Sequence, residues 1–142
     1  MKKLLVIALL AAANIAIATQ AVNIAGTYNC SVHSNTNFHS TVTYTLDKNN
    51  TDFSKGYSAY SFKGLSESGT IYQGQAIANG SNLAIYYKNL DPTKTNDYGI
   101  EIVTVTHNFD SQDRPVTILR NIGYGAPFNR NSTFQITCIS KN

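Results

Sequence analysis

The sequence predicts an all-β fold, an eight-stranded antiparallel up-and-down barrel. Apolar and polar residues alternate with a period of two along most of the chain, and no helical repeat follows residue 21. Turn-forming residues separate the apolar stretches at short intervals. A closed barrel leaves no unpaired edge strand, which favours it over the alternative, an open or sandwich-like antiparallel β fold. Within that alternative an immunoglobulin-like sandwich is disfavoured, because its core is built around a Trp and this chain has none.

The first 21 residues have the features of a secretory signal peptide. Two lysines precede an apolar run from Leu4 to Ala13, and small residues follow. Cleavage after Ala18 or after Ala21 satisfies the small-residue rule, and we prefer Ala21. Asn14 interrupts the apolar run, which disfavours a retained membrane anchor because about 20 continuous apolar residues are needed to span a bilayer. We therefore expect a bacterial protein that is secreted or periplasmic, with a single domain over residues 22–142 and no integral membrane segment after signal removal.

The first four strands are expected at residues 27–33, 40–47, 56–63 and 70–78. The first, TYNCSVH, alternates Tyr, Cys and Val with polar residues. The second, STVTYTLD, is the clearest, because Val, Tyr and Leu alternate with threonine as in a strand with one face in a core and one in water. The third places Tyr60 and Phe62 on one face, and the fourth follows the turn-forming stretch KGLSESG.

The last four strands are expected at residues 82–89, 98–107, 116–123 and 132–140. An Asn79-Gly80 pair predicts a tight hairpin before the first of these, because Asn-Gly accepts the positive φ angles of such turns. The loop LDPTKTND precedes the sixth strand, in which Ile100 and Ile102 are assigned to the core and Glu101 to the solvent. A loop with a proline precedes the seventh strand, and the loop YGAPFNRN precedes the eighth.

The two cysteines lie near the two ends of the expected domain. Cys30 shares a face with apolar residues of the first strand and Cys138 with apolar residues of the last, so both thiols are expected to point into one core. A disulfide between them would fasten the seam of a closed sheet, and export favours it because oxidising compartments preserve such bonds. Two buried free thiols, or a bridge to another chain, are the alternatives.

The start of the first strand, Gly26-Thr27-Tyr28, resembles the Gly-x-Trp opening of lipocalins and the related calycin barrels, with Tyr in place of Trp. The resemblance implies a calycin-like barrel in which a basic residue from a late strand crosses the aromatic ring, and Arg130 and Lys141 are candidates. Biotin binding, as in avidins, is not expected, because that site is walled by Trp. Lipocalins hold apolar ligands in a hollow barrel, whereas the bulky residues expected to point inward here favour a filled one.

Charge and chemistry exclude several classes of function. Eleven basic residues fall to nine when Lys2 and Lys3 leave with the signal, against eight acidic ones, and they form no basic run, so no nucleic-acid partner is expected. No metal site is assigned, because His33 and His39 lack a recognisable third ligand, and no cofactor is expected. No catalytic residue is assigned either. The only glutamates are Glu67 and Glu101, and no nucleophile-elbow motif is present.

The binding residues predicted from the sequence are Tyr98, Tyr124, Phe128 and Arg130. A loop with two aromatics and an arginine has the composition of interaction sites, and a small molecule, a protein or a glycan would suit it. The alternative is that these aromatics fold back as a plug over the barrel end. The sequence thus predicts a non-catalytic binding module. The alternative function is a small extracytoplasmic, hydrolase-like enzyme with a site at one barrel end, using His107 and Glu101.

Overall fold

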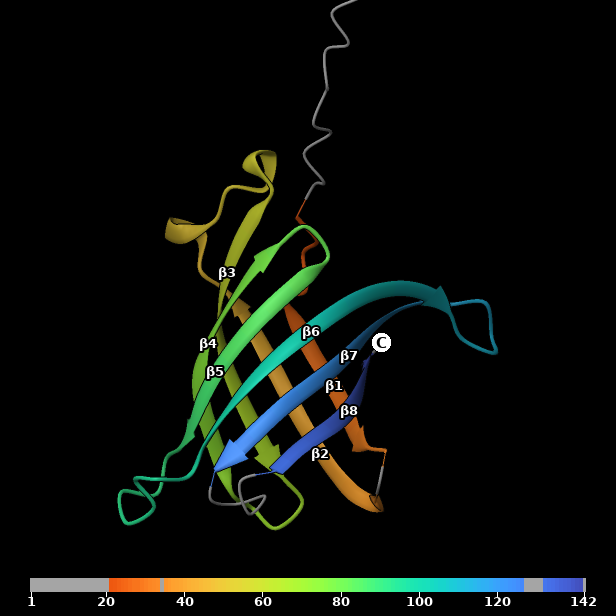
Figure 1. Cartoon of the computed structure of the whole chain (residues 1–142). Coiled ribbons are helices and arrows are strands. Elements are labelled where there is room, and N and C mark those ends of the chain that lie inside the picture. Colours follow the sequence, from red (N-terminus) through yellow and green to blue (C-terminus); the bar gives the residue numbers. More distant parts are fainter. Residues whose placement is uncertain (1–20, 34, 127–131, 142) are drawn as a thin grey trace, which may run out of the picture.

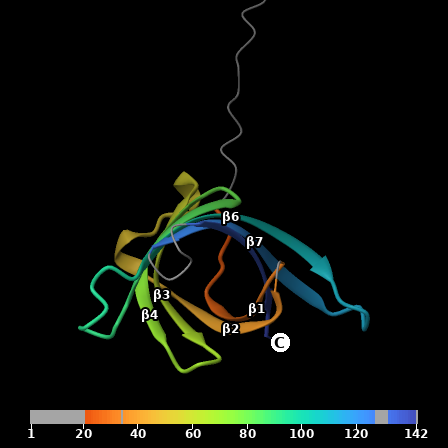
Figure 2. The same ribbon diagram turned by 60° about the horizontal axis from the view of Figure 1, so that its bottom comes forward.

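The computed structural model describes residues 21–33, 35–126 and 132–141. Within them, eight antiparallel strands form a closed barrel in which each strand pairs with its neighbours in sequence and the first pairs with the last (Figure 1; Figure 2). The strands are β1 (Gly26–Val32), β2 (Asn35–Leu46), β3 (Tyr57–Ser66), β4 (Ile71–Asn79), β5 (Asn82–Asn89), β6 (Tyr98–Phe109), β7 (Pro115–Ala126) and β8 (Ser132–Ser140). Two short 3-10 turns, η1 (Lys48–Asn50) and η2 (Phe53–Lys55), are the only described helical elements. The predicted up-and-down barrel is confirmed.

The hairpin between β4 and β5 lies where the sequence predicts it, but its two turn residues are not the predicted Asn79-Gly80 pair. Asn79 pairs with Asn82, so the turn consists of Gly80 and Ser81. Gly80 has a φ of 59°, as required at the first position of a two-residue type II′ turn. The glycine therefore provides the positive φ, and Asn79 ends the strand before it.

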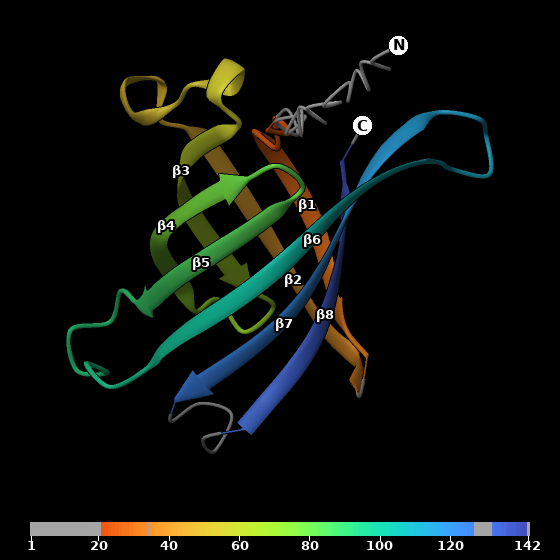
Figure 3. The same ribbon diagram turned by 45° about the horizontal axis from the view of Figure 1, so that its top comes forward.

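The segment preceding β1 closes one end of the barrel. Ile24 is completely buried, and its backbone N–H donates to the hydroxyl of Tyr60 at 3.2 Å. The same hydroxyl donates to the carbonyl oxygen of Val22 at 3.1 Å, and the backbone N–H of Val22 donates to Gly80 at 3.2 Å. Tyr28 donates to the carbonyl oxygen of Ile24 at 3.0 Å, and burial raises the pKa of Tyr28 to about 12. Figure 3 shows this segment at the barrel end that carries the β4–β5 turn.

Aromatic side chains fill the barrel below this segment. Tyr44 contacts Tyr28, Tyr60 and Phe62 edge to face, with ring centroids 5.7, 6.3 and 5.5 Å apart. Inward aliphatic side chains complete this core: Ala76, Ala78, Leu83, Ile85, Val103, Val105 and Leu119. Bulky inward residues thus fill this half of the barrel, as the sequence predicts for the whole of it.

The disulfide lies on the seam that closes the barrel. Cys30 and Cys138 are direct partners across β1 and β8, with Cα atoms 4.0 Å apart, and the bond between them is buried in the interior. This confirms the predicted pairing. The β1–β8 ladder covers only Tyr28 to Val32 of β1 and is the shortest of the described ladders. The covalent bond therefore reinforces the seam with the fewest paired residues among the described ladders.

Candidate functional site

The half of the barrel away from the N-terminal segment is hollow. A cavity of about 310 Å³ lies at the end where β3 turns into β4 and β5 leads to β6. Small-molecule sites range over about 300 to 1,000 Å³, so this cavity has the size of a small ligand. Its walls include the disulfide and four inward aromatic side chains, Phe62, Tyr72, Tyr87 and Phe134, and Tyr98 borders it. Its polar lining residues are Ser40, Ser66, Asp97, Glu101, Asn121 and Thr133.

Glu101 points into this cavity and is only 5% exposed, which corrects its assignment to the solvent. Its neighbours in β6, Ile100 and Ile102, point outward, and Ile102 is 67% exposed. The second half of β6 indicates which face of the strand points into the barrel. Val103 and Val105 face the core there, and two-residue periodicity then places Glu101 on the same inner face.

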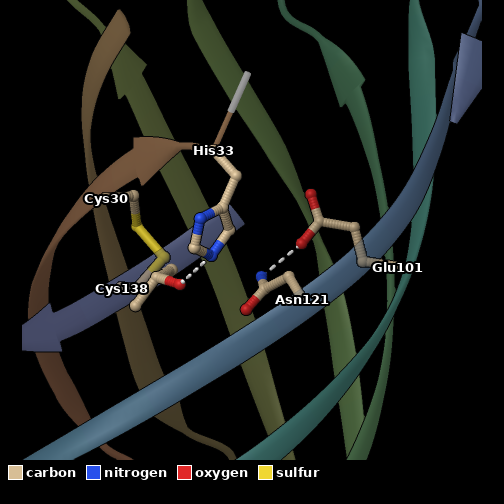
Figure 4. Close-up of a disulfide and its surroundings, with 6 residues drawn as sticks. Cys30, His33, Glu101, Asn121 and Cys138 are labelled. Atoms are coloured by element: carbon tan, nitrogen blue, oxygen red, sulfur yellow. Dashed lines mark hydrogen bonds between the residues drawn. A yellow bond between two sulfur atoms is a disulfide. The ribbon is translucent and has the colours of Figure 1, made fainter. Parts of the chain in front are cut away.

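Two neighbouring side chains hold the Glu101 carboxylate. The amide nitrogen of Asn121, on β7, donates to Oε2 of Glu101, and the hydroxyl of Tyr87 also hydrogen-bonds the carboxylate. Figure 4 shows the Asn121 amide nitrogen turned toward Glu101 and its oxygen turned away. Burial raises the pKa of Glu101, and the two hydrogen bonds offset this only in part. Burial and the nearby Glu101 also raise the pKa of Tyr87 and of Tyr44.

Glycine residues make room for this arrangement. Gly123 is the β7 partner of Glu101 and the neighbour of Phe134 on β8. A Cβ atom on Gly123 would lie 2.5 Å from the ring of Phe134 and 2.8 Å from Cγ of Glu101. Gly99 likewise lies beneath the ring of Tyr87. Because these two glycines of β6 and β7 have no side chains, Glu101 and the rings of Tyr87 and Phe134 can lie against the sheet.

A second carboxylate, Asp97, lies directly before β6 and is 6% exposed. Its Oδ2 accepts hydrogen bonds from the amide of Asn89 at 2.7 Å and from the hydroxyl of Tyr72 at 3.2 Å. Its backbone pairs with Asn89 and with Lys94, which closes the loop between β5 and β6. Burial and the nearby Asp97 raise the pKa of Tyr72.

Three buried polar atoms have no hydrogen-bond partner among the described residues. Oδ1 of Asp97 and Oδ1 of Asn121 belong to residues that line the cavity, whereas the hydroxyl of Tyr44 lies in the filled half. Asn121 is 4% exposed and Tyr44 2% exposed. Buried polar atoms in folded proteins are nearly always paired, so unpaired atoms around a cavity mark positions where a ligand can complete the hydrogen bonding.

The structure distributes the binding residues predicted from the sequence between the cavity rim and the outer surface. Tyr98 lines the rim of the cavity, and its ring lies 6.4 Å from that of Tyr86. Tyr124 points outward from β7 and is partly exposed. Phe128 and Arg130 lie outside the described residues. Lys141, a candidate for the basic residue of a calycin barrel, is exposed and pairs through its backbone with Thr27.

Tyr124 belongs to an apolar area on the outer face of β4 to β7, which we call the outer belt. One row of the belt, set by strand register, consists of Ile77, Ala84, Ile102 and Ile122. The next row consists of Tyr86, Ile100 and Tyr124. Their large side chains are all more than a third exposed. The polar outer face typical of β2, with its threonines, therefore does not extend to these strands.

Other site types find no support in the part of the chain that the structure describes. No group of three or more His, Cys, Asp or Glu side chains is placed to hold a metal ion. His33 instead pairs with the hydroxyl of Thr137 at 3.0 Å (Figure 4). Among the described helices, none has the length and hydropathy of a membrane-crossing segment. No family model, no curated protein and no solved structure matches the chain.

Proposed function

We propose that this barrel is a non-catalytic binding protein that holds a small molecule in the hollow half of its interior. The cavity has the dimensions of a small-ligand site, mostly aromatic and aliphatic walls and a few buried polar groups. The filled half forms a rigid floor, because the segment before β1 is hydrogen-bonded across the barrel end. The ligand therefore enters from the end that carries Asp97 and Tyr98.

One observation carries this proposal: buried Asn121 and Asp97 both line the cavity, and each has an acceptor oxygen without a partner among the described residues. Such an atom costs about 1 to 3 kcal/mol when left unpaired in a protein interior. A structural core has no reason to retain two of them around a hollow space. A ligand whose hydrogen-bond donors reach either oxygen would remove that cost.

We further propose that the protein works outside the cytoplasm. The buried disulfide is compatible with an oxidising compartment. The apolar and small-residue pattern of residues 1–21 supports export by a signal peptide. A calycin-like classification rests on Gly26 and Tyr28, and Tyr28 is buried in the aromatic core.

A fragment screen by ligand-observed NMR tests the proposed binding. The wild-type protein is compared with Ser40→Phe, which places a ring in the cavity, and with Thr45→Phe, which adds the same ring to the exposed face of the same strand. Both variants are first checked for folding by circular dichroism. We expect fragments that bind wild type and Thr45→Phe but not Ser40→Phe. If every fragment that binds wild type also binds Ser40→Phe, or if none binds, the proposal is wrong.

The alternative function, a small hydrolase, is favoured by one observation. Glu101 is a carboxyl group with a raised pKa in the same cavity as Asp97, as general acid catalysis requires. Against it, the Glu101 carboxylate is already engaged by Asn121 and Tyr87. Nitrophenyl glycosides and esters test this alternative. Turnover above buffer that disappears in Glu101→Gln supports the enzyme, and equal rates exclude Glu101 as its catalyst.

A further inference from the structure

We propose that the ligand of the cavity is a small organic cation, an ammonium or amidinium group on a compact apolar body, bound in the cavity that Glu101 and Asp97 line. This inference rests on the proposed function, since it names the chemical class of the molecule that the barrel holds. It follows from three properties of the cavity: its acidic side chains, its unpaired acceptors and its aromatic walls.

The described cavity wall carries acidic side chains and no basic ones. Glu101 and Asp97 are the only carboxyl groups among the described lining residues, and no Lys, Arg or His lines the cavity with them. The hydrogen bonds to Glu101 come from a neutral amide and a neutral hydroxyl, and the same is true of Asp97. A buried carboxyl group is either protonated or balanced by a cation, because an uncompensated charge is costly in a protein interior. A cationic ligand would provide this balance.

The unpaired atoms require hydrogen-bond donors. Oδ1 of Asp97 and Oδ1 of Asn121 are both acceptors, and each belongs to a side chain more than nine-tenths buried. Figure 4 shows that the Asn121 oxygen faces away from Glu101, so it is free to accept from another group. An ammonium group has three N–H donors and an amidinium has four. A carboxylate or phosphate ligand has none to offer and would be repelled by both acids.

The walls and volume define the rest of the ligand. Tyr87 stacks against Phe62 with ring centroids 5.3 Å apart and meets Tyr72 edge to face at 5.6 Å. Aromatic faces attract cations and pack against apolar groups, so they suit an organic cation better than a hydrated metal ion. Since a water molecule occupies about 30 Å³, a cavity of about 310 Å³ holds a ligand of roughly ten non-hydrogen atoms.

The test uses three probes with the same body and different head groups: phenethylamine, 2-phenylethanol and phenylacetate. Binding to the disulfide-bonded protein is measured by isothermal titration calorimetry at neutral pH. We expect phenethylamine to bind at least about tenfold more tightly than the alcohol, and phenylacetate not to bind. The benzyl series, benzylamine, benzyl alcohol and benzoate, repeats the comparison with a shorter body and should give the same order.

Variants locate the binding. Glu101→Gln and Asp97→Asn each keep the shape of the side chain and remove its charge, and each should lower the affinity for phenethylamine by about tenfold or more. The alcohol, which carries no charge, should change by less than about threefold. Glu67→Gln is the matched control: it is the same substitution at the exposed glutamate outside this cavity, and it should leave every affinity unchanged. Melting curves confirm that each variant is folded.

Four results would overturn the inference. Three are equal binding of the alcohol and the amine, tightest binding of the carboxylate, and unchanged amine affinity in both cavity variants. The fourth is absence of binding by every amine at millimolar concentration. In each case the fragment screen with Ser40→Phe decides separately whether the cavity binds small molecules at all. Failure of the cation preference is thereby distinguished from failure of the proposed function.

Discussion

Replacing both cysteines by alanine should lower the stability of this barrel more than any other pair of substitutions of similar size. Cys30 and Cys138 join β1 to β8 across the shortest described ladder, and both side chains are buried. Without the bond, the seam depends on the pairing between Tyr28 and Val32 of β1 and their partners on β8. Alanine is chosen because it leaves no thiol to oxidise and buries no unpaired hydroxyl, as serine would.

The size of the effect follows from the position of the bond in the chain. The sequence separation is 108 residues, for which the chain-entropy relation gives about 5 kcal/mol at 25 °C. A domain of about 120 residues has an unfolding entropy of about 0.25 kcal/mol per kelvin, so the melting temperature should fall by about 20 °C. Stabilities of single domains are about 5 to 15 kcal/mol, so the bond supplies a large share of the total.

Differential scanning calorimetry with and without reductant measures this effect. Oxidised wild type should melt well above the double variant, and fully reduced wild type should melt near it. Reductant should leave the double variant unchanged, which controls for other effects of the reagent. If the oxidised wild type and the double variant melt within about 5 °C of each other, the disulfide does not stabilise the pairing of β1 with β8 and the entropy argument is wrong.

Three further predictions concern the interior. Because burial raises the pKa of Glu101, the folded chain keeps a proton that the unfolded chain has lost. The free energy of unfolding of the wild type should therefore fall as pH rises from about 4.3 through the pKa of Glu101 in the folded state. Urea titrations of Glu101→Gln should lack this pH dependence. If the free energies of unfolding of both proteins change in parallel with pH, the raised pKa of Glu101 is wrong. Val103→Ala should cost about 2 kcal/mol, because Val103 is fully buried. Its neighbour Ile102 lies on the outer belt, so Ile102→Thr should change stability by less than about 0.5 kcal/mol, and equal losses would refute the assigned faces. Tyr60→Phe leaves the N–H of buried Ile24 unpaired and should lower the unfolding free energy by about 1 to 3 kcal/mol. An unchanged urea midpoint would show that the segment before β1 does not depend on this hydroxyl.

The candidate site was only partly predictable from the sequence, for a definite physical reason. Tyr98 was predicted as part of an aromatic patch that extends from the loop of Tyr124, and the structure places it beside the cavity, with its binding role untested. Glu101 was missed because it lies between Ile100 and Ile102, and an apolar residue was assumed to face the core. The alternation of Val103 and Val105 with threonines indicates the opposite inward face, the one that includes Glu101. Choosing between these two faces requires knowing where the hollow half of the barrel begins. Asn121 gave no signal of its own.

The sequence by itself determined the strands, their order and the pairing of the cysteines. Those features depend on local periodicity, on turn residues and on the face that each cysteine shares with its neighbours, all of which are properties of short segments. Only the tertiary structure decided that the barrel is filled around Tyr44 and hollow around Glu101. That outcome depends on which side chains from all eight strands meet at the same height in the barrel, including glycines such as Gly123 that leave room for larger partners. The periodicity of a single strand cannot report how much space its neighbours leave.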